Sequence, residues 1–139
     1  MYVKPSLTLT HAATLQMLAA AVAQAEAMGQ PQCIVIVDAS GEVLGDIRMT
    51  GAKYLSRKSA AAKARTAAST GGPSSAIPEQ VHLQIAAATG GDVTGLGGGL
   101  PIYMDGVLVG GIGVGSGSAA QDIEVGQAAL HAIGAQDSL

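Results

Sequence analysis

The feature that most constrains the fold is a concentration of glycine in the C-terminal half of the chain. Twelve of the 20 glycines lie between positions 90 and 117. Glycine in a helix interior costs about 1 kcal/mol relative to alanine, so this region is expected to form strands, turns and loops. Within it, the apolar runs 100–104 and 107–114 flank Asp105-Gly106, a dipeptide typical of two-residue hairpin turns. The sequence therefore predicts a β-hairpin here.

The same glycines have two interpretations, and the residues alone do not separate them. Without side chains, glycines let backbone N–H groups approach a ligand, and Ser116 between Gly115 and Gly117 adds a hydroxyl. Glycines also permit bulges, tight turns or close packing of a helix on a sheet. Neither common nucleotide motif is present: Ser118 stands where a dinucleotide fingerprint needs its third glycine, and no phosphate loop occurs.

The rest of the chain predicts helices and a second hairpin. Apolar residues at spacings of three and four predict a helix over 10–28, with Thr8 or Thr10 as its cap. The runs 32–38 and 42–49 predict strands joined by a turn. Further helices are expected over 53–69, 78–89 and 119–133. The predicted class is α+β, in the order α-ββ-α-α-ββ-α, with helices on the faces of an antiparallel sheet.

Composition bears on size, location and assembly. The length predicts one domain over residues 1–139. Aromatic residues make up 2% of the chain, with no Trp or Phe, so alanine and aliphatic side chains must fill a thin core. We expect such a domain to gain stability by burying further surface in a homo-oligomer. Because no signal-peptide pattern and no apolar run of about 20 residues occurs, we expect a cytoplasmic protein without a membrane partner.

The charge pattern argues against nucleic acid and singles out one lysine. A net charge of -3 with few aromatic residues provides neither attraction to phosphates nor stacking surfaces, so no nucleic-acid partner is expected. Six of the seven basic residues lie between positions 48 and 65. Most should form a solvated helix face. Lys63 stands apart from the others among alanines, which makes it the candidate for a buried functional charge.

Patterns for metal binding and covalent catalysis are weak. The histidines His11, His82 and His131 have no metal-ligand partner at a spacing of four, and only Glu79 and His82 lie three positions apart. No metal site is predicted, although one imidazole is enough to ligate a haem iron. The lone Cys33 lies in an apolar run and is expected to be a buried, inert thiol. Asp122 lies near the start of the last helix, where an acid favours the helix dipole.

A series of motifs, in order along the chain, resembles the GlcG/HbpS-like family, whose domain also occurs at the C-terminus of some cobalamin adenosyltransferases. They are Val37-Asp38-Ala39-Ser40-Gly41, Arg48-Met49, Lys63-Ala64-Arg65-Thr66-Ala67, Gly97-Gly98-Gly99-Leu100-Pro101-Ile102, Gly110-Gly111-Ile112-Gly113-Val114 and Gln121-Asp122. The resemblance implies about five antiparallel strands flanked by helices, and oligomeric assembly. It also implies that haem or a related tetrapyrrole is bound by some members. The family often has Val-Ser-Gly-Gly where this chain has Val-Gly-Ser-Gly-Ser over 114–118, so the loop there differs.

Together these patterns support an oligomeric small-molecule binding protein for haem or another anionic tetrapyrrole. The glycine segments and the basic second helix would form the pocket, in which backbone N–H groups and a cationic side chain bind a propionate or carboxylate. The candidate ligand-binding residues are Arg48, Lys63, Gly98, Gly99, Pro101, Gly115, Ser116 and Gly117.

Two other functions are consistent with the same residues. One is an enzyme that acts on a small carboxylate, as an isomerase, hydrolase or deaminase. Its candidate catalytic residues are Lys63, Asp38 and Asp122, with Ser116 beside them, because proton transfer requires only a positioned titratable group in a dry pocket. The other is a structural subunit whose glycines serve assembly alone.

Overall fold

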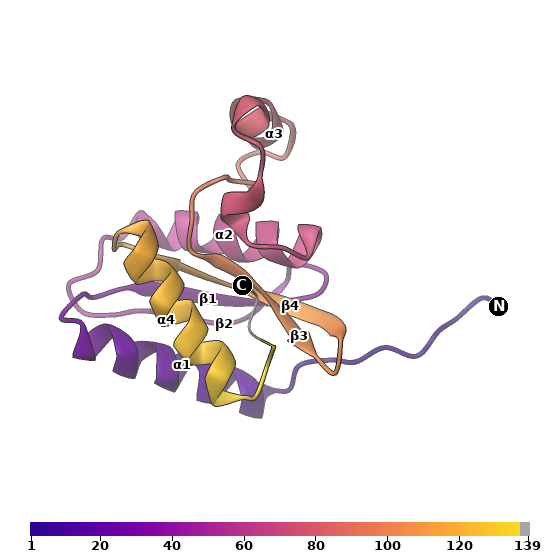
Figure 1. Ribbon diagram of the computed structural model, residues 1–139, viewed down its shortest axis with the longest axis horizontal. Coiled ribbons are helices and arrows are strands. Elements are labelled where there is room, and N and C mark those ends of the chain that lie inside the picture. Colours follow the sequence, from indigo (N-terminus) through magenta and orange to yellow (C-terminus); the bar gives the residue numbers. More distant parts are fainter. Residues whose placement is uncertain (137–139) are drawn as a thin grey trace.

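The computed structural model describes residues 1–136 (Figure 1). Its elements are α1 (His11–Ala27), β1 (Cys33–Asp38), β2 (Val43–Arg48), α2 (Ser56–Thr70), η1 (Ser74–Ala76), η2 (Glu79–Val81), α3 (His82–Ala88), β3 (Gly99–Met104), β4 (Val107–Gly115) and α4 (Ala119–Ala132), where η marks a 3-10 helix. The predicted order of helices and hairpins is confirmed. Thr10 caps α1, as expected, by accepting a hydrogen bond from the backbone N–H of Ala13.

The sheet has four strands in the order β2-β1-β4-β3, and every neighbouring pair is antiparallel. The expectation of about five strands is not confirmed among residues 1–136. The physical reason is that residues 1–8, which lie outside the helices and hairpins, are exposed and have no strand partner. In Figure 1 this segment extends away from the body.

Helices cover both faces of the sheet. On one face, α1 and α4 lie side by side, and Met17, Leu130 and the strand residues Ile34 and Ile112 pack together there. On the other face, α2 packs against the second set of side chains of β1, which include Val35. Because β1 is buried on both faces, its whole run of residues is apolar up to Asp38.

The glycines of β4 explain how α2 comes so close to the sheet. A Cβ atom at Gly111 or Gly113 would collide with the backbone of α2, at Ala64 in the first case and at Ala60 and Ala64 in the second. The small side chains of α2 and the missing side chains of β4 therefore form one contact surface. For these two glycines, the packing interpretation is confirmed.

The segment between α2 and β3 differs most from its prediction. Instead of one helix over 78–89, it contains η1, η2 and the short α3, and no residue of η2 or α3 is buried. Figure 1 shows this segment projecting from the body as an arm. The second helix also begins at Ser56 and not at residue 53. No helix in the described part of the chain is long and apolar enough to span a bilayer.

Candidate functional site

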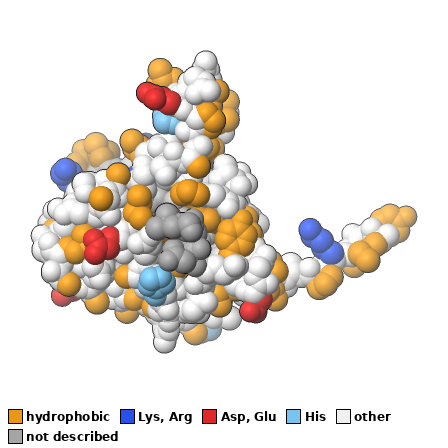
Figure 2. Space-filling model, viewed as in Figure 1, with side chains coloured by type: hydrophobic (Ala, Val, Ile, Leu, Met, Phe, Trp, Pro, Cys, Tyr) orange, Lys and Arg blue, Asp and Glu red, His pale blue; other side chains and the backbone are white. Residues whose placement is uncertain are grey.

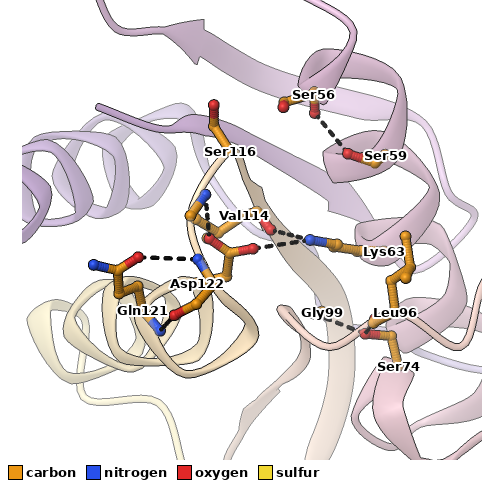
Figure 3. A network of polar contacts seen from close by, with 12 residues as sticks. Ser56, Ser59, Lys63, Ser74, Leu96, Gly99, Val114, Ser116, Gln121 and Asp122 are labelled. Carbon is orange, nitrogen blue, oxygen red and sulfur yellow. Dashed lines mark hydrogen bonds and ion pairs between the residues drawn. The ribbon is translucent and has the colours of Figure 1, made fainter. Parts of the chain in front are cut away.

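A buried ion pair joins the two predicted acid–base candidates that lie closest together. Lys63 on α2 places its Nζ 3.0 Å from Oδ2 of Asp122 on α4, and both side chains are almost fully buried. The same Nζ donates to the carbonyl of Val114 at 2.8 Å, and Oδ1 of Asp122 accepts the N–H of Gly117 at 3.1 Å. The pair therefore ties α2, β4 and α4 together (Figure 3). Lys63 is buried as expected. Asp122 lies in the first turn of α4, as expected, but it is buried, and Ser118 is the residue that caps the helix.

A small pocket of about 270 Å³ opens beside this ion pair. The pocket is lined by α2 and the residues just before it, by the segment that precedes β3, and by the β4–α4 loop with the start of α4. The lining residues are Lys53, Ser56, Ser59, Lys63, Leu96, Gly97, Ser116, Gly117, Ala119 and Asp122. Ser59 and Ser56 precede Lys63 by four and seven residues, so all three lie on one face of α2. This helical spacing is visible in the sequence and indicates that the two serines share a helix face with Lys63. Figure 3 shows Ser56, Ser59 and Lys63 in succession along α2, with Ser116 across from them just beyond the end of β4.

The Ser116 backbone is strained. Its φ angle is +95°, in a region that L-residues rarely adopt, and the cost of such a conformation is about 1–3 kcal/mol. Two hydrogen bonds hold the residue there: its hydroxyl accepts the N–H of Lys53 at 3.0 Å, and its carbonyl accepts Nε2 of Gln30 at 3.2 Å. The strained residue thus presents its side chain at the pocket.

Four other candidate ligand-binding residues pack near the pocket without lining it. Gly98, Gly99, Pro101 and Gly115 are all buried. A Cβ at Gly99 would meet the carbonyl of Lys63, and one at Gly115 would lie 3.1 Å from the Ser59 hydroxyl. These glycines therefore let the strands approach α2, and they shape the pocket from behind.

The remaining two candidates lie farther away. Asp38 belongs to the β1–β2 turn, where its Oδ1 accepts backbone N–H groups of Ser40 and Glu42 at 2.8 and 3.1 Å. Its partner on β4 is Gly110, four positions along the strand from Val114, which is about 13 Å at the rise of an extended chain. The structure therefore does not bring Asp38 to the Lys63–Asp122 pair, and Asp38 stabilises the turn.

Arg48 lies at the same end of the sheet as the Lys63 pocket but two strands away. It pairs with Cys33, which pairs in turn with Gly115, so the separation across the sheet is about 10 Å. Arg48 is exposed, and its side chain makes no ion pair or hydrogen bond with another of the described residues 1–136. The charge is available to a ligand.

A larger groove of about 620 Å³ lies between the end of α1 and the edge strand β2. It is lined by Val22, Ala25, Glu26, Gly29, Gln30, Pro31, Ile47, Arg48, Met49 and Thr50. Ligand pockets usually measure about 300–1,000 Å³, so this groove is within the range and the Lys63 pocket just below it. The lining combines aliphatic walls with one cation, Arg48, and one anion, Glu26.

Two residues beside the groove were missed in the sequence. The sulfur of Met49 accepts the backbone N–H of Gln32 at 3.4 Å. The Gln32 side chain is fully buried, and neither of its amide atoms has a hydrogen-bond partner among residues 1–136. A glutamine at the start of a strand looks like a surface residue in sequence, because its burial comes from the Gly117 loop that packs over it.

The lone Cys33 is buried between the sheet and α2, as expected. Burial raises the pKa of its thiol, and the nearby guanidinium groups of Arg48 and Arg57 oppose that rise only in part. A neutral thiol is a poor nucleophile, so Cys33 is a structural residue.

A family comparison matches most of the chain. Residues 9–131 match the model described as haem degrading protein HbpS-like. The corrinoid adenosyltransferase PduO of Citrobacter freundii is 33% identical over 135 residues, which is 94% of this chain but 40% of that protein. The chain therefore spans about two fifths of the length of this curated relative.

Solved structures agree with the family match. A complex of PduOC with haem superposes with a TM-score of 0.87 at 30% identity, covering 96% of this chain and all of that one. The protein ORFY of Klebsiella pneumoniae gives a TM-score of 0.92 at 27% identity, covering 99% of this chain and 98% of the other. The four-stranded sheet and its three covering helices are thus shared with proteins of known structure.

Proposed function

This chain belongs to the HbpS-like family of haem-degrading proteins, and on that basis we propose that it binds haem or a closely related anionic tetrapyrrole in the groove between α1 and β2. The observation that carries the proposal is the groove itself, which is large enough for a drug-sized ligand and includes the guanidinium of Arg48 in its lining. The similarity to the PduOC–haem complex supports the choice of ligand.

The residues of the groove fit the three requirements of haem. Val22, Ile47 and Pro31 offer an apolar surface for the macrocycle. Arg48 offers a guanidinium for a propionate, which would form a charge-assisted hydrogen bond. Met49 offers a thioether, a known axial ligand of haem iron. When bound, haem would supply an iron centre for electron transfer or oxygen chemistry.

The histidines fit this site less well than Met49. His11 opens α1, whereas the groove lies at the other end of that helix, about 22 Å away at 1.5 Å per residue. His82 lies on the arm, where its Nε2 is 2.7 Å from the carbonyl of Ile77. His131 lies in the last turn of α4. None of the three histidines lines the groove, so Met49 is the proposed iron ligand.

A haem titration followed by the Soret band tests the proposal. We expect a saturable shift at one haem per chain, and about tenfold weaker binding by Arg48→Ala, since one exposed charged hydrogen bond is lost. Arg57→Ala is the matched control, because Arg57 is an exposed arginine outside the groove. Met49→Leu, which nearly keeps the side-chain volume, should change the Soret position. No saturable shift, or equal affinities for the two arginine variants, would overturn the proposal.

We further propose that the chain acts as a homo-oligomer. Val81 and Leu83 on the arm are exposed, the latter by 85%, and Tyr2 and Val3 of the N-terminal segment are exposed as well. Figure 2 shows these two extensions carrying apolar side chains away from the body. A second copy could bury them, and native mass spectrometry that detected only the monomer at micromolar concentration would refute this.

The enzyme hypothesis loses part of its support. Of its three catalytic candidates, Lys63 and Asp122 contact each other, whereas Asp38 is held in a distant turn. Both oxygens of Asp122 already accept hydrogen bonds, so the pair is more suited to binding an anion than to moving a proton.

A further inference from the structure

The unused hydrogen-bond donors beside Lys63 point to a second site. A lysine ammonium has three N–H donors, and Lys63 uses two of them, on Val114 and Asp122. The Ser116 hydroxyl accepts a hydrogen bond from Lys53 but donates to no residue of the described chain. Ser56 likewise makes no hydrogen bond through its hydroxyl within residues 1–136, although its carbonyl accepts one from Ser59. The pocket therefore offers three donors that lack acceptors.

The acceptors of the pocket are already occupied. Asp122 receives Lys63 on one oxygen and Gly117 on the other. Two lysines, Lys53 and Lys63, against the single Asp122 leave the lining with one net positive charge (two minus one). The excess charge belongs to Lys53, which is exposed, because the buried Lys63 is already paired with Asp122. Free donors, occupied acceptors and this nearby cation together favour a monoanion.

The size of the pocket limits the anion to a small one. Its volume of about 270 Å³ corresponds to roughly nine water molecules at about 30 Å³ each. That is less than half of the groove assigned to the tetrapyrrole, about 620 Å³. Leu96, Gly97 and Ala119 supply the apolar part of the wall, which suits a short hydrocarbon chain.

The strain at Ser116 indicates that its side chain has a role. Part of that role is structural, because the hydroxyl accepts the backbone N–H of Lys53 at 3.0 Å, but its own O–H has no acceptor among residues 1–136. At φ +95° a glycine would be unstrained, and the chain has glycine on either side of this position. Residues held in rare conformations are concentrated at functional sites, where the surrounding structure offsets their cost. Ser116 in this conformation directs a hydroxyl to the pocket, which glycine could not provide.

We propose that the pocket formed by Lys63, Ser116 and Ser56 binds a small carboxylate, at a site separate from the tetrapyrrole groove. The third N–H of Lys63 and the hydroxyl of Ser116 donate to the carboxylate oxygens. Asp122 keeps Lys63 in place and charged, so it is a positioning residue. Ser116 is the residue that makes this chain's pocket selective.

The test uses the full chain and sodium lactate as the probe, with sodium chloride at equal ionic strength as the blank. In ¹H–¹⁵N correlation spectra we expect saturable shifts centred on Lys53, Gly97 and Gly117. Ser116→Gly and Ser116→Ala should both bind lactate at least tenfold more weakly, since each lacks the hydroxyl. Ser69→Ala, on an exposed part of α2, should bind like the wild type.

Stability separates a binding role from a structural one. Ser116→Gly relieves the backbone strain and should raise the melting temperature, whereas Ser116→Ala keeps the strain and should not. The proposal predicts that both variants lose binding although their stabilities differ. It is overturned if lactate causes no saturable shift, if Ser116→Gly binds lactate as tightly as the wild type, or if inorganic phosphate binds more tightly than lactate.

Discussion

Replacing Gly113 by alanine tests the contact between α2 and β4 most severely. A Cβ at this position would lie 2.6 Å from the backbone nitrogen of Ala64 and closer still to the carbonyl oxygen of Ala60. Ordinary contacts begin at 3.4 Å, so α2 must move outward by at least 0.8 Å (3.4 minus 2.6). The collision involves helix backbone, which cannot rotate away as a flexible side chain could.

The loss of stability comes from the contacts between α2 and β4 that this movement weakens. A gap of 0.5–1 Å loses about a quarter to a half of the dispersion energy of the atoms that face it, and overpacking a core typically costs about 1–3 kcal/mol or more. We expect Gly113→Ala to lower the free energy of unfolding by about 3 kcal/mol, and the melting temperature by about 10 °C for a chain of this size.

Urea unfolding followed by circular dichroism measures the change. Gly72→Ala is the matched control, because a Cβ at Gly72 would meet nothing within 4 Å, and its stability should stay within about 1 kcal/mol of the wild type. If Gly113→Ala were as stable as Gly72→Ala, the packing role assigned to the glycines of β4 would be wrong.

Three further predictions concern buried polar groups. Lys63→Met leaves the buried Asp122 without its counter-ion, although Gly117 still donates to it, and should cost about 3–5 kcal/mol in urea unfolding. The double variant Lys63→Met/Asp122→Leu should recover most of that loss, and equal losses in the two variants would contradict the pairing. Gln32→Met removes a buried amide that has no hydrogen-bond partner among residues 1–136 and should stabilise by about 1 kcal/mol in the same assay. A loss of stability would instead show that bound water satisfies the amide. Burial raises the pKa of Cys33, so the folded chain holds the thiol proton more tightly than the unfolded chain, and stability should fall as the pH rises above the ordinary thiol pKa. Cys33→Ala should not lose stability in this way, and parallel pH profiles for the variant and the wild type would contradict the prediction.

The order of helices and hairpins could be predicted from the sequence because each depends on residues that are close together along the chain. Thr10 as a cap, Asp105-Gly106 as a hairpin turn and the alanine-rich helices each act within a few residues. The arm between α2 and β3 could not be predicted in the same way. Its residues are exposed, so no periodic apolar face marks where η2 ends and α3 begins.

The candidate site was predictable in part, and for one reason. Lys63 is a lone cation in an alanine-rich helix, so its burial was visible, but its partner Asp122 is 59 positions away and only the fold brings the two together. The glycines gave no indication of which of them face a helix. Successive residues of a strand face opposite sides of the sheet, so the face of each glycine depends on its position in β4. Gly111 and Gly113 face α2, whereas Ile112 faces the layer formed by α1 and α4.

The groove proposed for the tetrapyrrole is formed by contacts between α1 and β2, and no sequence motif indicates these contacts. Arg48 was a candidate because of its place in the family-like pattern, but Met49 and the aliphatic wall became neighbours only through the packing of α1 against β2. Gln30 lines this groove and also donates to the Ser116 carbonyl, so the two proposed sites share a boundary.

A crystal structure of the chain grown with haem tests the central claim most directly. We predict the macrocycle in the groove between α1 and β2, against Ile47, with a propionate within hydrogen-bonding distance of Arg48 and the Met49 sulfur on the iron. Haem bound elsewhere with this groove empty, or haem in contact with Lys63, would contradict the account.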